Sequence, residues 1–272
     1  MRDRRFWRNT VPPVVVTVAL AVSVGLPARP RAQQAAPAGS ARATAPIDLT
    51  GYWVSVVSED WRYRMVTPQK GDYGSLPLNA EGQRVARTWE PSMDGRCEAY
   101  GVGGIMRMPG RLKISWQDDN TLKIETDAGS QTRLLHFDAT TRPSGERTWQ
   151  GHSIARWEGP TTVGRGRGGR GRGGPPPQGG SLHVVTTQFR AGYLRPNGVP
   201  YSDEASIVEN FDRLPAQDNG DVWLLVITTV EDPKYLEQPF FTSTHFKLER
   251  DGAKWNPSPC STDPPGPPTL KR

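Results

Sequence analysis

The chain has 272 residues, a formal net charge of +6 and a pI of about 9.5. Residues 1–32 contribute +5 of this charge and the arginines of the segment 164–180 contribute +4, which leaves about −3 for the rest. A slightly acidic body lacks the positive field that tracks a phosphate backbone, so the sequence predicts no nucleic-acid partner.

The N-terminal residues follow the layout of a secretory signal peptide. A basic start precedes an apolar run over 11–26, and Ala32 stands before a polar stretch. We therefore expect cleavage of 1–32 near Ala32 and a periplasmic or secreted protein. Pro12 and Pro13 interrupt the run, which is short for a bilayer, so we predict no permanent membrane span. Residues 33–46 are predicted to be a low-complexity spacer and 261–272 a Pro-rich tail.

Short β-type runs separated by turn residues fill the segment 47–260, which predicts a single all-β domain. Alternation in RLKISW and TLKIET indicates a hairpin. Further short returns, including RPSGE at 142–146, predict an antiparallel meander. We expect about nine strands that close into a barrel, over the ranges 51–57, 111–116, 121–126, 132–137, 147–159, 181–189, 207–214, 221–232 and 241–250.

Two segments carry more specific expectations. The run 221–232 is apolar at successive positions 223–227, which is typical of a central strand covered on both sides. The segment NAEGQRVARTW, residues 79–89, indicates a short helix capped by Asn79.

The segment 164–180, GRGRGGRGRGGPPPQGG, stands between the predicted strands 147–159 and 181–189. It therefore occupies the position of a hairpin turn, which tolerates great length because closure entropy rises only with the logarithm of loop length. Few of its side chains favour order, so we predict a disordered insert.

Cys97 and Cys260 are the only cysteines. An even count in an exported chain favours a disulfide over a metal site or a nucleophile. Two buried free thiols are the alternative. The bridge would join the C-terminal end of the domain to its first half.

The motif DLTGYW, with Gly51 and Trp53, resembles the Gly-x-Trp signature that opens lipocalins and their calycin relatives. Lys247 and Arg250 are candidates for the basic partner of that Trp. The blocks GHSIARWEG, SLHVVTT, VENF and EDPKYLEQPF resemble those of a large group of exported bacterial proteins of unassigned function. In that group the turn after Trp-Glu-Gly is usually tight, so the insert is a departure. The resemblance implies a lipocalin-like barrel and an exported protein, but no activity.

Our first hypothesis is therefore a lipocalin-like barrel that binds a small apolar or amphipathic molecule in an aromatic-lined cavity. The candidate ligand-binding residues are Trp53, Trp157, Tyr193, Tyr201 and Trp223.

The second hypothesis is an acid/base enzyme on the same barrel, such as a hydratase, isomerase or hydrolase. Glu209, flanked by apolar residues, would act with His152 or Asp232 as general acid and base. Asp232 precedes Pro233 and equally suits the end of a strand. No metal-ligand motif or phosphate-binding loop is present in the sequence, so we predict neither a metal nor a cofactor.

The third hypothesis is a cell-envelope interaction module. In this case the barrel core would be filled, and the segment 164–180 would contact anionic surface polymers.

Overall fold

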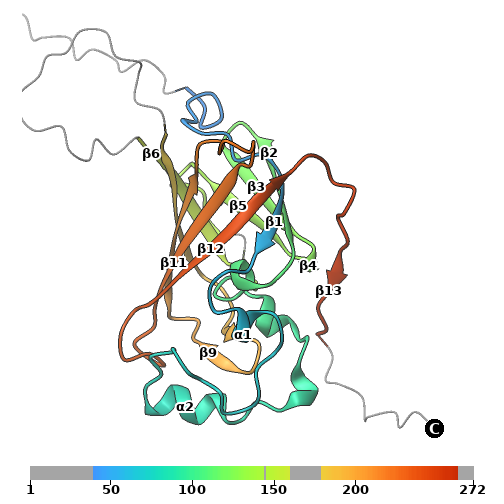
Figure 1. Ribbon diagram of the computed structural model, residues 1–272. Coiled ribbons are helices and arrows are strands. Elements are labelled where there is room, and N and C mark those ends of the chain that lie inside the picture. The colour runs from blue at the N-terminus through green and yellow to red at the C-terminus, as the bar shows by residue number, and fades with distance from the viewer. Residues whose placement is uncertain (1–38, 144, 160–178, 263–272) are drawn as a thin grey trace, which may run out of the picture. The chain divides into compact units, whose positions relative to one another are not determined.

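Nine strands close into a barrel in the computed structural model, which describes residues 39–143, 145–159 and 179–262 (Figure 1). The described residues lie within one compact unit, Gly39–Arg272. The predicted signal peptide, residues 160–178 of the insert region and most of the tail lie outside the described ranges. The strands neighbour one another in the order β1 (Gly51–Val56), β12 (Phe240–Glu249), β11 (Trp223–Glu231), β10 (Ser206–Arg213), β7 (Ser181–Thr187), β6 (His152–Glu158), β5 (Thr132–His136), β3 (Thr121–Thr126) and β2 (Arg111–Asp118), and β2 pairs with β1.

Each barrel strand corresponds to one of the nine predicted strands, which confirms the all-β barrel. β6 pairs with β7 in antiparallel register as far as Glu158 and Ser181. The Arg/Gly-rich segment therefore connects two neighbouring antiparallel strands, as its position in the sequence predicted.

One connection of the predicted meander is wrong. β5 and β6 are parallel, with Leu135 opposite Ser153, so the chain does not turn back directly at 142–146. Residues 147–151 instead run beside the segment after β7, where the Arg190 N–H donates to the Thr148 carbonyl. The chain enters β6 only after Gly151. Its φ of 63° is a backbone conformation that glycine adopts more readily than other residues.

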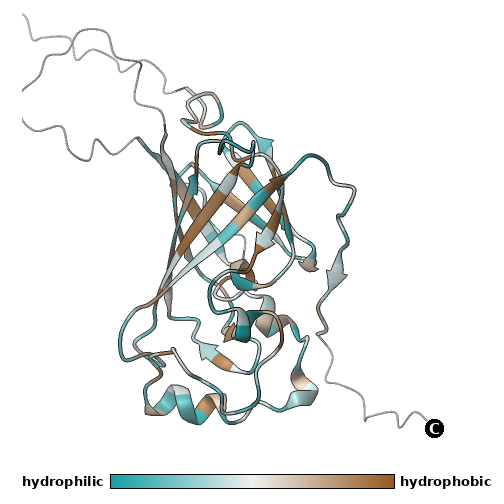
Figure 2. Cartoon of the chain, viewed as in Figure 1, coloured by the Kyte–Doolittle hydropathy of each residue, from teal (hydrophilic) through white to brown (hydrophobic). Residues whose placement is uncertain are grey.

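The expectation of a strand covered on both sides is also wrong. Along β11, Leu224 and Val226 are buried inside the barrel, whereas Ile227 is exposed on the outer wall. A closed barrel has one interior, so apolar residues at successive positions must alternate between core and surface. The brown and paler bands along the strands show this mixture of hydropathy (Figure 2).

Two apolar clusters fill the fold. The barrel cluster lies within the strands and includes Trp53, Leu112, Ile124, Phe211, Val226 and Phe246. The cap cluster joins residues of the strand ends to the segments beyond them, and it includes Leu78, Phe189, Tyr201, Ile207, Val230 and Phe240.

A polar layer separates the two clusters. Along β10 the buried positions are Ile207 in the cap cluster, Glu209, and Phe211 in the barrel cluster. β11 and β12 likewise pass through buried threonines between the two clusters. The buried polar residues that face this layer are Arg133, Ser153, Thr186, Glu209, Thr228, Thr242 and Thr244.

Short elements make up the end of the fold around the cap cluster (Figure 1). They are α1 (Trp61–Arg64), α2 (Ala80–Ala86), η1 (Pro91–Met93), η2 (Cys97–Tyr100), η3 (Ile105–Arg107), and the hairpin of β8 (Gly192–Arg195) and β9 (Val199–Tyr201). The Asn79 side chain accepts a hydrogen bond from the Gly82 N–H at 2.8 Å, which confirms the predicted cap of α2. No helix in the described ranges is long and apolar enough to cross a bilayer.

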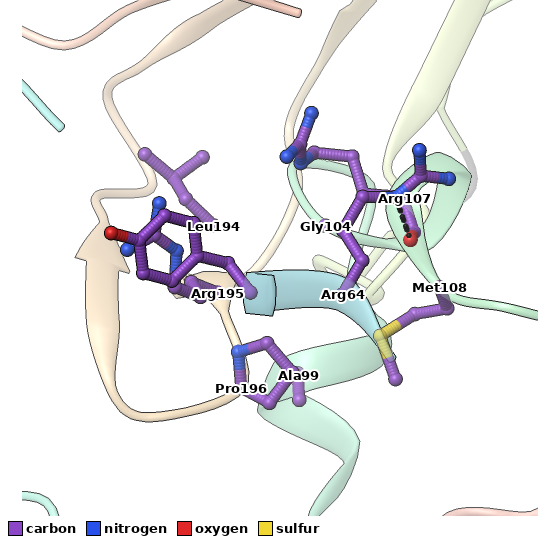
Figure 3. A pocket seen from close by; sticks show the side chains of 9 residues that line it. Arg64, Ala99, Gly104, Arg107, Met108, Leu194, Arg195 and Pro196 are labelled. Atoms are coloured by element: carbon purple, nitrogen blue, oxygen red, sulfur yellow. Dashed lines mark hydrogen bonds between the residues drawn. The ribbon is translucent and has the colours of Figure 1, made fainter. Parts of the chain in front are cut away.

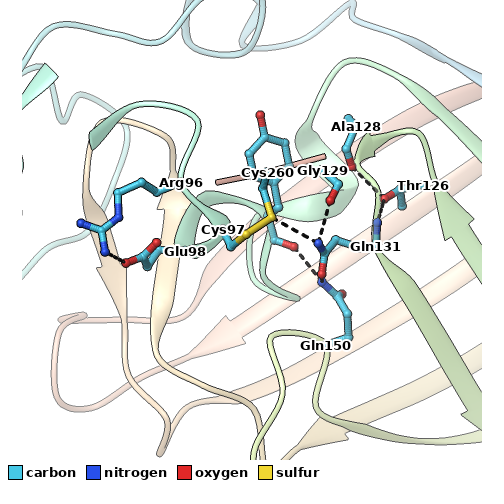
Figure 4. The surroundings of a disulfide bond; sticks show 10 residues. Arg96, Cys97, Glu98, Thr126, Ala128, Gly129, Gln131, Gln150 and Cys260 are labelled. Atoms are coloured by element: carbon cyan, nitrogen blue, oxygen red, sulfur yellow. Dashed lines mark hydrogen bonds and ion pairs between the residues drawn. A yellow bond between two sulfur atoms is a disulfide. The ribbon is translucent and has the colours of Figure 1, made fainter. Parts of the chain in front are cut away.

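The predicted disulfide is present (Figure 4). Cys97 in η2 is bonded to Cys260 across a sequence separation of 163, and Cys260 directly follows β13 (Ser258–Pro259). β13 pairs in parallel with β4 (Ala128–Gly129), and the Gln131 amide approaches the Cys260 sulfur at 3.4 Å. The bridge therefore fixes the last described segment to η2 and to the β3–β5 connection.

Candidate functional site

A small cavity beside α1 brings together three buried arginines (Figure 3). Arg64 comes from α1, Arg107 from η3 and Arg195 from the end of β8. They expose 6, 9 and 4 % of their surface, respectively. We call the cavity the arginine pocket, and its remaining lining residues are Tyr63, Ala99, Gly104, Met108, Leu194 and Pro196.

Arg64 is held by three hydrogen bonds. Its Nε donates to the Arg107 carbonyl at 2.9 Å, which is the dashed line in Figure 3. Nη1 donates to Glu59 Oε1 at 2.9 Å, and Nη2 approaches Ser55 Oγ at 3.4 Å. Arg64 is thus paired with one carboxylate and also fixes the position of η3.

Arg107 has a carboxylate partner as well. Its Nη2 donates to Asp60 Oδ2 at 2.7 Å. Asp60 has a left-handed backbone with φ of 53° and lies directly before α1. The turn into α1 therefore supplies two acids, Glu59 and Asp60, that each neutralise one arginine of the pocket.

Arg195 differs from the other two because its hydrogen bonds are to backbone carbonyls. Nη2 donates to the Gly74 carbonyl at 3.0 Å and Nη1 to the Asp72 carbonyl at 3.4 Å. Its guanidinium lies 4.0 Å from the centre of the Tyr63 ring. Within the described ranges no carboxylate forms an ion pair with Arg195. Backbone carbonyls and the Tyr63 ring are its direct partners, and the charges of Asp60 and Asp72 favour it from a greater distance.

The electrostatics of the pocket reflect this excess of positive charge. Burial and then repulsion by Arg107 lower the pKa of Arg195 to about 10. Burial, followed by the same repulsion, also lowers the pKa of Arg64. Three guanidinium groups lie beside two paired carboxylates, and a buried group with a strongly shifted pKa, such as Arg195, is a candidate for a functional site.

Glu59 links the pocket to the outer wall of the barrel. Oε2 accepts hydrogen bonds from Ser58 Oγ at 2.6 Å and lies 3.2 Å from His245 Nδ1 on β12. Burial raises the pKa of Glu59, but hydrogen bonds from Ser58 and the backbone and the charge of Arg64 lower it overall. Glu59 is therefore held ionised beside Arg64.

The lining of the pocket combines positive charge with apolar groups. The volume of the pocket is about 10 Å³, which suits one water-sized group. Guanidinium groups bind carboxylate and phosphate oxygens in a planar, two-pronged geometry. Ala99, Met108, Leu194 and Pro196 add an apolar wall to the charged one. No group of three or more His, Cys, Asp or Glu side chains in the described ranges is placed to hold a metal ion.

Glu209 lies fully buried in the polar layer of the barrel. It forms a two-pronged ion pair with Arg133, with Nη2 to Oε2 at 2.5 Å and Nη1 to Oε1 at 3.1 Å. Arg133 also approaches Thr186 Oγ1, which is hydrogen-bonded to Ser153 Oγ. Glu209 therefore belongs to an interior network of paired polar groups.

The structure places the other two candidate catalytic residues elsewhere. His152 stacks on His136, with ring centres 5.3 Å apart, and its Nε2 lies 3.0 Å from the Thr141 carbonyl. Asp232 follows β11 and accepts hydrogen bonds from the Ser202 N–H and hydroxyl. In the described part of the chain, no hydrogen bond or ion pair joins Glu209, His152 and Asp232 to one another, and their catalytic roles stay predictions.

The five aromatic residues predicted to bind a ligand do not surround one cavity. Trp53 is buried in the barrel cluster and donates its indole N–H to the Leu49 carbonyl, while Lys247 pairs with Asp221. Trp157 packs with Trp116 and Phe137 and donates to the Ala41 carbonyl.

The remaining three also lie apart. Tyr201 is buried in the cap cluster, and burial raises the pKa of its phenol. Trp223 is half-buried on the outer side of β11. Tyr193, on β8, is half-buried, and burial and Glu98 raise its pKa. Their roles in binding remain predictions.

Sequence analysis missed the three arginines of the pocket. Each stands between two apolar residues, in YRM, MRM and LRP, which is a signal for a buried or half-buried position. This signal is not selective, because Arg62 in WRY stands between two aromatic residues and yet is mostly exposed.

No family model matches the chain, and no curated protein matches it in sequence.

Proposed function

We propose that this protein is an exported, lipocalin-like binding protein for a small amphipathic molecule that carries a carboxylate. The arginine pocket would hold the carboxylate. The observation that carries the proposal is the buried guanidinium of Arg195, which forms no ion pair in the described ranges and lies beside two further arginines. A bound anion would supply the missing negative charge.

The shape of the pocket favours a carboxylate. The planar, two-pronged geometry of a guanidinium group matches a carboxylate, and because the cavity holds only one water-sized group, the lining side chains must move apart to admit it. The apolar wall formed by Met108, Leu194 and Pro196 suits the first carbons of an apolar chain. The disulfide and the predicted signal peptide support an exported location.

The proposal moves the ligand away from the barrel interior. The sequence suggested an aromatic-lined cavity inside the barrel, but the inward positions of the described strands are filled by the barrel cluster and the polar layer. The resemblance to exported lipocalin-like proteins of unassigned function supports the lipocalin-like part of the proposal. It assigns no ligand.

The first test is titration calorimetry of the purified protein with decanoate, with decanol and acetate as comparisons. We expect decanoate to bind more tightly than either, because only it combines charge and an apolar chain. Arg195→Gln should weaken decanoate binding by about 10- to 100-fold, the effect of losing one charge-assisted hydrogen bond. Binding should also weaken as the pH rises through about 10, where Arg195 loses its proton.

Arg62→Gln is the matched control. Arg62 lies over the same Tyr63 ring but is mostly exposed and pairs with Asp72 on the surface. Its removal should leave decanoate binding within about twofold of the original value. Arg195→Lys should give an intermediate affinity, since it keeps the charge but not the planar fork. Equal losses in Arg62→Gln and Arg195→Gln would overturn the proposal.

A further inference from the structure

Large apolar side chains are exposed at one particular turn of the molecule. Trp61, Met65 and Val66 expose 65, 57 and 68 % of their surface. They fall within six consecutive residues. The other large apolar residues exposed in the described ranges are Leu214, which follows β10, Ile227 on β11 and Phe241 on β12.

The local backbone places these side chains away from the core. The Met65 N–H donates to the Trp61 carbonyl at 2.9 Å, so the two residues lie one helical turn apart and on the same side of α1. Arg64, between them in sequence, is buried in the arginine pocket. One arginine of the turn, Arg64, thus faces inward, whereas the large apolar side chains of Trp61, Met65 and Val66 face water.

Positive charge accompanies this apolar surface. Arg62 lies in the same turn, with its side chain mostly exposed. It pairs with Asp72, and a surface ion pair of this kind contributes little, so Arg62 can exchange Asp72 for an anionic headgroup at small cost. The other three arginines of this region, Arg64, Arg107 and Arg195, are buried, so Arg62 supplies the exposed positive charge of the turn.

We propose that Trp61, Met65 and Val66, with Arg62, form a docking surface for an anionic lipid bilayer. Tryptophan is favoured at the boundary between headgroups and hydrocarbon. A cation beside it is attracted to an anionic leaflet and is effective within a Debye length of the surface. The combination of an apolar cluster and a cation at one exposed turn therefore fits a peripheral contact with a membrane.

The docking surface and the arginine pocket share one element. Tyr63 and Arg64 line the pocket, and both stand between Trp61 and Met65 in sequence. Docking at this turn would bring the pocket to the headgroup region. An amphipathic carboxylate partitions into bilayers with its charged group among the headgroups, so the pocket would encounter such a ligand in the headgroup region. The docking itself does not depend on the pocket having that ligand.

Sedimentation with vesicles tests the docking surface. The purified protein is mixed with vesicles of phosphatidylcholine containing phosphatidylglycerol, and with vesicles of phosphatidylcholine alone. We expect binding to the anionic vesicles that decreases with added salt. The triple variant Trp61→Ser/Met65→Ser/Val66→Ser should reduce the affinity about tenfold or more, and Arg62→Glu should reduce it on anionic vesicles.

The matched control is the triple variant Leu214→Ser/Ile227→Ser/Phe241→Ser. It removes the same number of exposed apolar side chains elsewhere. The two triple variants are otherwise identical, so binding by any other part of the chain is common to them. Equal affinities in the two triple variants would overturn the proposal, as would equal binding of the protein to both kinds of vesicle. Calorimetry with decanoate on the first triple variant reports separately on the pocket.

Discussion

Arginine has two opposite roles in this protein. Arg133 is fully buried and has its own carboxylate, Glu209, in a two-pronged ion pair inside the barrel. Arg195 is almost as buried, yet in the described ranges it has carbonyls and a tyrosine ring as partners. In the first arrangement the buried charge has a carboxylate partner, whereas in the second it forms no ion pair within the described ranges.

The Arg133–Glu209 pair predicts a large effect of one substitution. Glu209→Gln should lower the free energy of unfolding by about 3–5 kcal/mol, because it leaves the Arg133 charge buried without its partner. Urea unfolding of the purified protein measures this. Glu81→Gln is the control, since Glu81 pairs with Arg84 on the exposed side of α2 and its loss should cost less than about 1 kcal/mol. An equally small effect at Glu209 would contradict the structural role.

At the scale of elements, the β8–β9 hairpin positions Arg195. Gly198 is the last residue of the turn between the two strands and has φ of 83°, and a Cβ atom there would lie 2.1 Å from Trp89 Cβ. The Asn197 amide donates to the Gln69 and Asp72 carbonyls, so the hairpin is also bound to the loop whose carbonyls hold Arg195. Packing of this hairpin therefore decides where the guanidinium lies.

Gly198→Ala should both destabilise the protein and weaken decanoate binding. The positive φ costs about 1–2 kcal/mol in any L-residue, and the clash with Trp89 should add roughly 1–3 kcal/mol. Gly220→Ala is a matched control, because Gly220 has φ of 81° but no atom within 4 Å of the added Cβ. Urea unfolding and calorimetry should separate the two variants. Similar values for both would show that the contact with Trp89 is unimportant.

The sequence was informative where a pattern is local. Alternation in RLKISW or TLKIET identifies a strand because the period of side-chain direction is two, and Asn79 identifies a helix start because capping needs only neighbouring N–H groups. The same reasoning failed at 142–151. Whether a chain returns antiparallel or crosses to a parallel neighbour depends on distant pairing, here between Thr148 and Phe189.

The candidate site was largely hidden from the sequence for the same reason. Arg64, Arg107 and Arg195 are separated by 43 and 88 positions, and only the fold brings them to one cavity. Glu209 was recognisable as an unusual residue because it is in phase with Ile207 and Phe211. Its partner Arg133 is likewise in phase with Leu135, but no local pattern joins the two.

At the scale of the whole molecule, the disulfide connects parts that are far apart in the chain. Removing it with Cys97→Ser/Cys260→Ser should lower the free energy of unfolding by about 5 kcal/mol on the chain-entropy account of a loop of 163 residues. Urea unfolding of the double variant measures this loss. The unsubstituted protein, after reduction of its disulfide, should give the same free energy of unfolding as the double variant. A midpoint that is unchanged by reduction would contradict the prediction.

The pairing of Glu158 with Ser181 has a practical consequence. β6 ends and β7 begins at this pair of residues. Any segment that joins the two strands therefore needs only to have its own two ends close together. A fluorescent protein with neighbouring termini could replace residues 160–178 without changing the register of β6 and β7. The connection between β6 and β7 is therefore a suitable position for inserting a foreign domain into the barrel.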